Sequence, residues 1–155
     1  MDKELASYFF DEVCKALGFV VTDHGFAPAQ LEVDDGVNFA FATFMGKNLA
    51  IECSLDEREG DVECYIARVI NGEKTTHWAV DESGVRVRDG LSDLLERRGV
   101  RERLFTRVGG LGLREQIPIT LGDFAQMLRK HGQEILNDSP TALADPPETP
   151  RRRLP

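Results

Sequence analysis

The stretch from residue 39 to residue 69 constrains the fold more than any other part of the sequence. Within it, apolar side chains recur at every second position and are interrupted by two short turns; they are Phe39, Phe41, Leu49, Ile51, Cys53, Leu55, Val62, Cys64 and Ile66. A period of two is that of a β-strand, and one apolar face implies a covering layer. The stretch therefore predicts three antiparallel strands, because turns this short cannot connect parallel strands.

Helical periodicity flanks this stretch on both sides. Residues 3–17 predict an amphipathic helix that begins at an Asp2 N-cap and ends at Gly18 in a left-handed conformation. Further helices are predicted at about 91–98, 101–108 and 121–136. Their apolar sides need a partner, and the apolar face of the sheet is available. We therefore expect an α+β fold of two layers, in which an antiparallel sheet of about five strands is packed by an N-terminal helix and C-terminal helices.

The remaining segments predict shorter elements. Asn71-Gly72 lies between two strand-like runs and favours a type I′ hairpin turn. Short strands are predicted at 19–22, 30–33, 74–80 and 85–88. Residues 113–120 read as irregular, with Thr120 as the cap of the helix that follows. The proline-rich residues 139–155 predict a disordered tail after a single domain of residues 1–138.

The charge is unevenly distributed along the chain. The net charge is −8, and residues 1–83 carry six Lys or Arg against seventeen Asp or Glu, a balance of −11. Residues 84–114 instead carry eight Arg against four acidic residues, a balance of +4. Because phosphate neutralisation dominates nucleic-acid affinity, the acidic body argues against general nucleic-acid binding. The Arg-rich segment is the place where an anionic partner could bind, although an exposed helical face is its ordinary interpretation.

The sequence offers no convincing constellation for catalysis, a cofactor or a metal. There is no GxSxG, P-loop, dinucleotide or HExxH motif, and His131 with Glu134 is an isolated pair. Cys53 and Cys64 are expected to face each other across a hairpin, most simply as packed thiols, with a disulfide, a redox switch or a metal site as alternatives. We therefore expect a non-enzymatic protein without a cofactor, a metal or catalytic residues.

Two sets of residues are candidate sites. The first is the acidic turn between two strands, formed by Asp56, Glu57, Glu59 and Asp61. It is a candidate for binding a protein partner, for example a basic protein. The second is a candidate anion site or pocket on the curved sheet, formed by His77, Trp78, Arg86 and Arg88.

Residues 8–70 carry a family resemblance. Leu17-Gly18-Phe19 ends the first helix, and the acid-rich hairpin of residues 49–66 follows. This arrangement resembles small bacterial α+β proteins known as hypothetical proteins or as immunity proteins of polymorphic toxin systems, in which a tyrosine stands at the position of Leu17. These motifs are structural, so the resemblance implies a fold and a type of function but no site residues. A second similarity is to acidic secretion chaperones, which hold an unfolded effector segment.

The expected function is accordingly that of a protein-interaction module that binds a partner through an acidic face. An immunity-type protein and an adaptor protein are examples of such a module. The alternatives are a small-molecule binder or an uncharacterised enzyme with a pocket on the sheet, a secretion-chaperone-like protein, and regulatory nucleic-acid binding through Arg97, Arg98, Arg101, Arg103 and Arg107. A homodimer through an exposed strand edge is a further possibility. Without an apolar run of membrane length or a signal peptide, the expected location is the cytoplasm.

Overall fold

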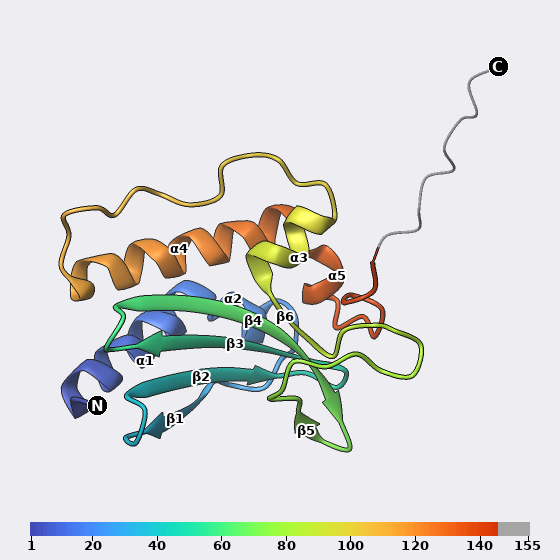
Figure 1. Ribbon diagram of the computed structural model, residues 1–155, viewed down its shortest axis with the longest axis horizontal. Helices are drawn as coiled ribbons and strands as arrows, with labels where there is room; N and C mark the ends of the chain where they lie inside the picture. Colours follow the sequence, from blue (N-terminus) through green and yellow to red (C-terminus); the bar gives the residue numbers. More distant parts are fainter. Residues whose placement is uncertain (146–155) are drawn as a thin grey trace.

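The computed structural model describes residues 1–145 as helices packed on one face of an antiparallel sheet (Figure 1). The sheet has six strands in the order β1-β2-β3-β4-β5, with β6 also pairing with β4: β1 (Gln30–Asp34), β2 (Phe39–Met45), β3 (Leu49–Asp56), β4 (Asp61–Ile70), β5 (Glu73–Lys74) and β6 (Arg88–Gly90). The helices are α1 (Lys3–Leu17), α2 (Phe19–Thr22), α3 (Leu91–Arg97), α4 (Leu113–His131) and α5 (Gln133–Leu136). The predicted α+β class and antiparallel sheet are confirmed.

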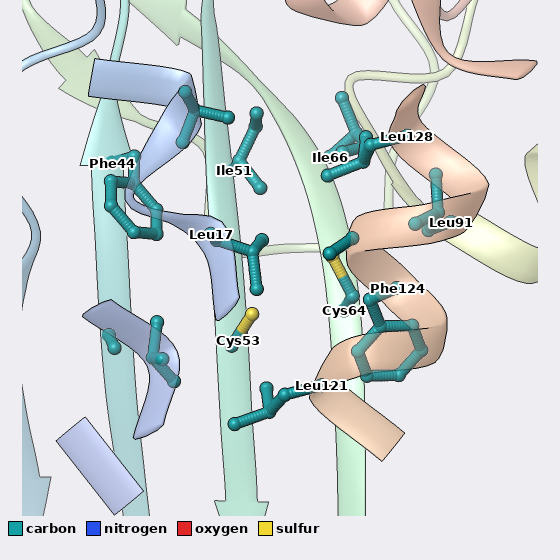
Figure 2. Close-up of a cluster of buried hydrophobic side chains, with 14 of the residues drawn as sticks. Leu17, Phe44, Ile51, Cys53, Cys64, Ile66, Leu91, Leu121, Phe124 and Leu128 are labelled. Carbon is teal, nitrogen blue, oxygen red and sulfur yellow. The ribbon is translucent and has the colours of Figure 1, made fainter. Parts of the chain in front are cut away.

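The core lies between the sheet and the helices, and the apolar residues of β3 and β4 face it as the alternating pattern predicts. The prediction is wrong for β2, because Phe39 and Phe41 lie on the opposite face and Ala40, Ala42 and Phe44 enter the core instead. Figure 2 shows Ile51 and Cys53 of β3 beside Cys64 and Ile66 of β4, with α1 and α4 over them. Cys53 and Cys64 stand directly opposite each other, and both are buried free thiols. The hydrogen bond with Cys53 and complete burial raise the pKa of the Cys64 thiol, so Cys64 packs as a neutral side chain.

The first helix begins as predicted but does not end as predicted. Asp2 accepts a hydrogen bond from the Glu4 N–H at 2.9 Å, which confirms the N-cap. Gly18, however, has φ −55° and continues the helical path into α2. A Cβ at this position would lie 2.5 Å from the Cys14 carbonyl oxygen, so Gly18 provides space rather than a left-handed turn. The strand predicted at 19–22 is therefore wrong: α2 satisfies its own backbone and sends Phe19 and Val20 into the core.

The long helix α4 starts at Leu113, so the prediction of irregular structure at 113–120 is wrong, and Thr120 is inside the helix rather than at its cap. Pro118 misled the prediction because proline has no N–H to donate to the carbonyl four residues earlier. That carbonyl, on Arg114, accepts a hydrogen bond of 2.9 Å from the Tyr8 hydroxyl of α1. A contact from another helix thus compensates for the proline.

The helix predicted at 101–108 is also wrong, because this segment is irregular. The carboxylate of Asp123 in α4 holds it by accepting hydrogen bonds from the Thr106 N–H at 2.7 Å and the Thr106 hydroxyl at 2.8 Å. These tertiary hydrogen bonds replace the ones that a helix would provide within the segment. Leu91–Arg97 does form the predicted helix, with Gly90 at its N-cap position.

The hairpin after β4 is confirmed only at its turn. Asn71 and Gly72 have φ of 53° and 78°, the two positive values that a type I′ turn requires. The returning strand predicted at 74–80 ends at Lys74, where the chain leaves β4, and the strand predicted at 85–88 lies at Arg88–Gly90. Thr75 marks the departure, because its N–H and hydroxyl both donate to the Arg68 carbonyl at 2.9 Å. The intervening residues loop out beside the sheet (Figure 1).

The segment that follows α5 is held by hydrogen bonds to a turn that lies much earlier in the sequence. The Asp138 carboxylate accepts hydrogen bonds from the N–H groups of Lys47 at 2.6 Å, Asn48 at 3.1 Å and Leu49 at 2.7 Å, in the turn between β2 and β3. A Cβ on Gly46 would come within 2.7 Å of this carboxylate, so the turn needs glycine there.

The segment after Asp138 also contributes to the core, through buried Ala142 and Leu143. The folded domain therefore continues past the predicted boundary at residue 138. The rest of the predicted tail, residues 146–155, lies outside the described residues. Within residues 1–145, no helix combines the length and the apolar character needed to cross a bilayer.

Candidate functional site

The face of the sheet turned away from the helices, which we call the open face, presents the alternate residues of the strands. The register aligns them in rows that run across β1 to β4. The first row is Asp34, Phe39, Asp56 and Asp61; the second is Glu32, Phe41, Ser54 and Glu63; the third is Gln30, Thr43, Glu52 and Tyr65. The strand register thus brings residues far apart in sequence onto one surface.

The first two rows form an acidic patch with two aromatic rings within it. We define this acidic patch as Glu32, Asp34, Asp56, Asp61 and Glu63 together with Phe39 and Phe41. The two phenyl rings are stacked, with centroids 5.6 Å apart and planes 8° from parallel. Carboxylates and aromatic faces both attract cations, the latter through the negative face of the ring.

Basic side chains provide little compensation for the acidic patch. In the described part of the chain, the only Lys or Arg in an ion pair with these carboxylates is Lys74, whose Nζ lies 3.5 Å from Glu32. The Glu32 side chain nevertheless remains 64% exposed. Partial burial raises the pKa of Glu63, and the negative charges of Asp61 and Asp93 raise it further. The two neighbouring carboxylates thus add to the effect of burial in disfavouring the ionised form of Glu63, and a bound cation would offset this.

The predicted partner-binding residues divide into two groups. Asp56 and Asp61 stand directly opposite each other within the acidic patch. Glu57 and Glu59 lie on the turn that connects their strands, where Glu57 is 3.9 Å from the N-terminal amine and Glu59 is exposed. Asp56 also shapes that turn, because its carboxylate accepts the Arg58 N–H at 2.9 Å and the Glu59 N–H at 3.2 Å.

The third row contains a buried ion network that sequence reasoning missed. Glu52 is buried in the middle of the open face, 2.5 Å from Arg88 Nη2 through one carboxylate oxygen and 2.5 Å from Lys74 Nζ through the other. Thr43 accepts a hydrogen bond of 2.9 Å from Lys74. The Tyr65 ring lies against the Arg88 guanidinium, 4.5 Å from its centroid. Burial alone raises the pKa of Glu52, but the hydrogen bonds from Lys74 and Arg88 outweigh it and hold the pKa below its usual value.

This network joins β3 to the segment that follows β5. Lys74 ends β5, and Arg88 begins β6 after the long loop. Because both oxygens of Glu52 bind cations, the network has the features of a structural fastening for the loop rather than of a free acid or base.

The structure brings together three of the four residues predicted for a pocket. Trp78, Arg86 and Arg88 line a shallow hollow of about 230 Å³, and Trp78 is 62% exposed. Both arginines are already in ion pairs, Arg88 with Glu52 and Arg86 with Asp145 at 3.4 Å. His77 lies apart, on a second and wider hollow of about 650 Å³ that Arg68 and Asp81 also line.

The arginines of the Arg-rich segment do not form one basic face. The helix α3 ends at Arg97, so the five arginines proposed for nucleic-acid binding do not share a helical surface. Arg97 contacts Asp89 and Asp145, and Arg98 contacts Glu134 and the Ala142 carbonyl. The Arg101 side chain donates to the Glu96 carbonyl at 2.9 Å. Arg97 and Arg98 therefore bind the C-terminal segment of the chain, whereas Arg103 and Arg107 are exposed.

Metal and nucleophile candidates remain without geometric support in residues 1–145. No cluster of three or more His, Cys, Asp or Glu residues there could hold a metal ion. His131 contacts Glu102, and Lys130 pairs with the same Glu102 at 2.7 Å. Comparison with known proteins adds nothing further, since neither a family model nor a curated protein nor a solved structure matches the chain.

Proposed function

We propose that this protein is a non-catalytic interaction module that binds a basic segment of a protein partner on the acidic patch. The observation that supports this proposal is the strand register, which places five carboxylates and two phenyl rings on one surface. The immunity-type or adaptor role and the cytoplasmic location expected from the sequence belong to the same proposal.

The composition of the acidic patch favours a basic protein segment over a single metal cation. Its carboxylates are distributed over three strands, β1, β3 and β4, rather than gathered around one point. The stacked Phe39 and Phe41 add apolar contact area and ring faces for Lys or Arg side chains. Charge complementarity of this kind increases the association rate and selects against acidic partners.

The proposal can be tested by affinity purification of the tagged protein from its own host, followed by mass spectrometry and by light scattering on the complex. We expect a stoichiometric basic protein. The variant Glu32→Gln/Asp61→Asn/Glu63→Gln neutralises the acidic patch while leaving the turn cap Asp56 in place. It should weaken binding of that protein by about tenfold or more, mainly through slower association.

A matched control changes the same amount of charge elsewhere. Asp11, Glu82 and Glu96 are exposed and lie outside the acidic patch. The variant Asp11→Asn/Glu82→Gln/Glu96→Gln should therefore retain most of the affinity. Equal losses in the two triple variants would mean that only the overall charge matters, and purification without a specific protein partner would contradict the proposal.

A second candidate function is binding of a small molecule beside Trp78. The observation that favours it is the exposed indole next to two arginines in a shallow hollow. Trp78 is the only tryptophan in the chain, so its fluorescence reports directly on that hollow. A saturable fluorescence change during ligand screening, abolished by Arg86→Ala, would support this function.

A further inference from the structure

The strand β1 forms a free edge of the sheet. In the described chain it pairs only with β2, and all five of its residues are exposed. An edge strand presents unpaired backbone N–H and C=O groups on its outer side, and these can pair with another extended segment. The edge borders the acidic patch, because Glu32 and Asp34 of β1 belong to that patch.

The side chains of β1 differ in character between the two faces of the sheet. Glu32 and Asp34 lie on the open face, opposite Phe41 and Phe39. Leu31 and Val33 lie on the other face and are exposed by 37% and 44%, among the most exposed large apolar residues of the described chain. The edge thus offers a negative row and an apolar row along one short strand.

This pattern argues against a second copy of the chain as the occupant. Side chains that stand opposite each other in an antiparallel pair lie on the same face. Two β1 strands related by a two-fold axis would therefore set Glu32 and Asp34 of one copy against the same carboxylates of the other. Like charges in directly opposite positions destabilise strand pairing.

We propose that β1 binds an extended segment of the partner as an added strand, in which basic residues alternate with apolar ones. The basic side chains would face Glu32 and Asp34 on the open face, and the apolar ones would cover Leu31 and Val33. Backbone hydrogen bonds along the edge supply affinity, and the alternating side chains supply selectivity. This inference rests on the proposed function and specifies the chemistry and conformation of the partner.

The test uses the full chain and three synthetic peptides labelled with a fluorophore. The first alternates lysine and valine. The second has the same composition in two blocks, lysines followed by valines, and the third alternates glutamate and valine. Affinities come from fluorescence anisotropy, and the binding site comes from amide chemical-shift changes in nuclear magnetic resonance spectra. We expect the alternating basic peptide to bind about tenfold more tightly than the block peptide, with the largest shifts in residues 30–34.

Two variants separate the added strand from charge attraction alone. Leu31→Ser/Val33→Ser removes the apolar row without changing the charge, and it should eliminate the preference for the alternating peptide. Glu57→Gln/Glu59→Gln neutralises two acids on the turn between β3 and β4, the half-buried Glu57 and the exposed Glu59, and it should leave that preference intact. All four positions lie on the surface, and unchanged circular dichroism confirms that both variants fold.

Three outcomes would overturn the inference. Equal affinity for the two basic peptides, with shifts centred on 56–63, would retain the proposed function but reject the added strand. A dimer in light scattering that Leu31→Ser/Val33→Ser dissociates would make a second copy the occupant. No binding of the alternating basic peptide also rejects the added strand, whereas failure of the host purification described above is what rejects the proposed function.

Discussion

The two faces of β3 are both buried, but they are buried by different means. On the helix side, Ile51 and its neighbours pack against apolar residues of α1 and α4 (Figure 2). On the open face, Glu52 is covered by ion pairs with Lys74 and Arg88. Apolar packing has no directional requirement, whereas a buried carboxylate needs its partners in place. The stability of the covered face therefore depends on the apolar character of its residues, whereas the stability of the open face depends on specific ion pairs.

The largest expected effect comes from breaking the pairs on the open face. Glu52→Ala leaves the buried Arg88 without its counter-charge and Lys74 with only Glu32, so we expect a loss of roughly 3–5 kcal/mol in the free energy of unfolding. Urea unfolding followed by circular dichroism measures this loss. Glu73→Ala, which removes an exposed acid from β5, is the matched control and should change stability by less than about 0.5 kcal/mol.

A further variant sharpens the same comparison. Replacing the whole network by Glu52→Met/Lys74→Met/Arg88→Met removes the charges together and should recover most of the lost stability. A triple variant as unstable as Glu52→Ala would show that the open face requires ionic pairing and cannot be closed by apolar packing.

The pH dependence of stability should have opposite signs for two carboxylates of the open face. The pKa of Glu52 is lowered in the folded state, so its contribution is present above the unfolded value of about 4.3 and is lost as the pH falls through the folded value. The pKa of Glu63 is raised, so its ionised form opposes folding and acidification relieves that opposition. Glu52→Gln should flatten the loss of stability between about pH 5 and about pH 3, and Glu63→Gln should steepen it.

These slopes are measured as urea midpoints at a series of pH values. A Glu52→Gln profile parallel to that of the wild-type protein would contradict the ion network in solution. The exposed residue Glu73 again serves as the control, because Glu73→Gln should leave the profile unchanged.

The smallest expected effect belongs to a conservative change on the covered face. Ile51→Val removes one buried methylene group next to Cys53 and Leu17, and we expect a loss of about 1 kcal/mol. Val37→Ala removes apolar atoms from a half-exposed position and should have less effect. If Ile51→Val cost as much as Glu52→Ala, the contrast between the two faces would not hold.

Sequence periodicity predicted the covered face of β3 and β4, because each of these strands carries its own pattern. It assigned Phe39 and Phe41 to the covered face wrongly, since both β2 faces carry apolar residues and the register decides between them. The three strands of 39–70, the Asp2 cap and the opposition of Cys53 and Cys64 all follow from neighbours along the chain. The elements it missed depend on distant contacts. Pro118 could be accommodated in α4 only with the Tyr8 hydroxyl beside it, and residues 101–108 are held by Asp123 of another element.

The candidate site was predicted only in part, again because some of its residues meet through contacts between distant parts of the chain. The turn residues Asp56 and Asp61 were visible as a cluster in sequence, but Glu32, Asp34 and Glu63 join them only through the strand register. The alternate positions of the same strands contained that information. The partners of Glu52 could not be identified from the sequence, because they lie 22 and 36 residues away, in two short strands at the ends of an irregular loop.

The hydrogen bonds between Asp138 and the turn at residues 47–49 have a consequence for the order in which parts of the domain fold during synthesis. Their two sides are about 90 residues apart, and the three N–H groups of the turn receive their carboxylate only from the later side. On a ribosome, β2 and β3 emerge long before residue 138. Their connecting turn therefore lacks its hydrogen bonds to Asp138 while α3 and α4 are still being synthesised. That turn therefore gains these hydrogen bonds only after Asp138 has left the ribosome, late in the folding of the nascent domain.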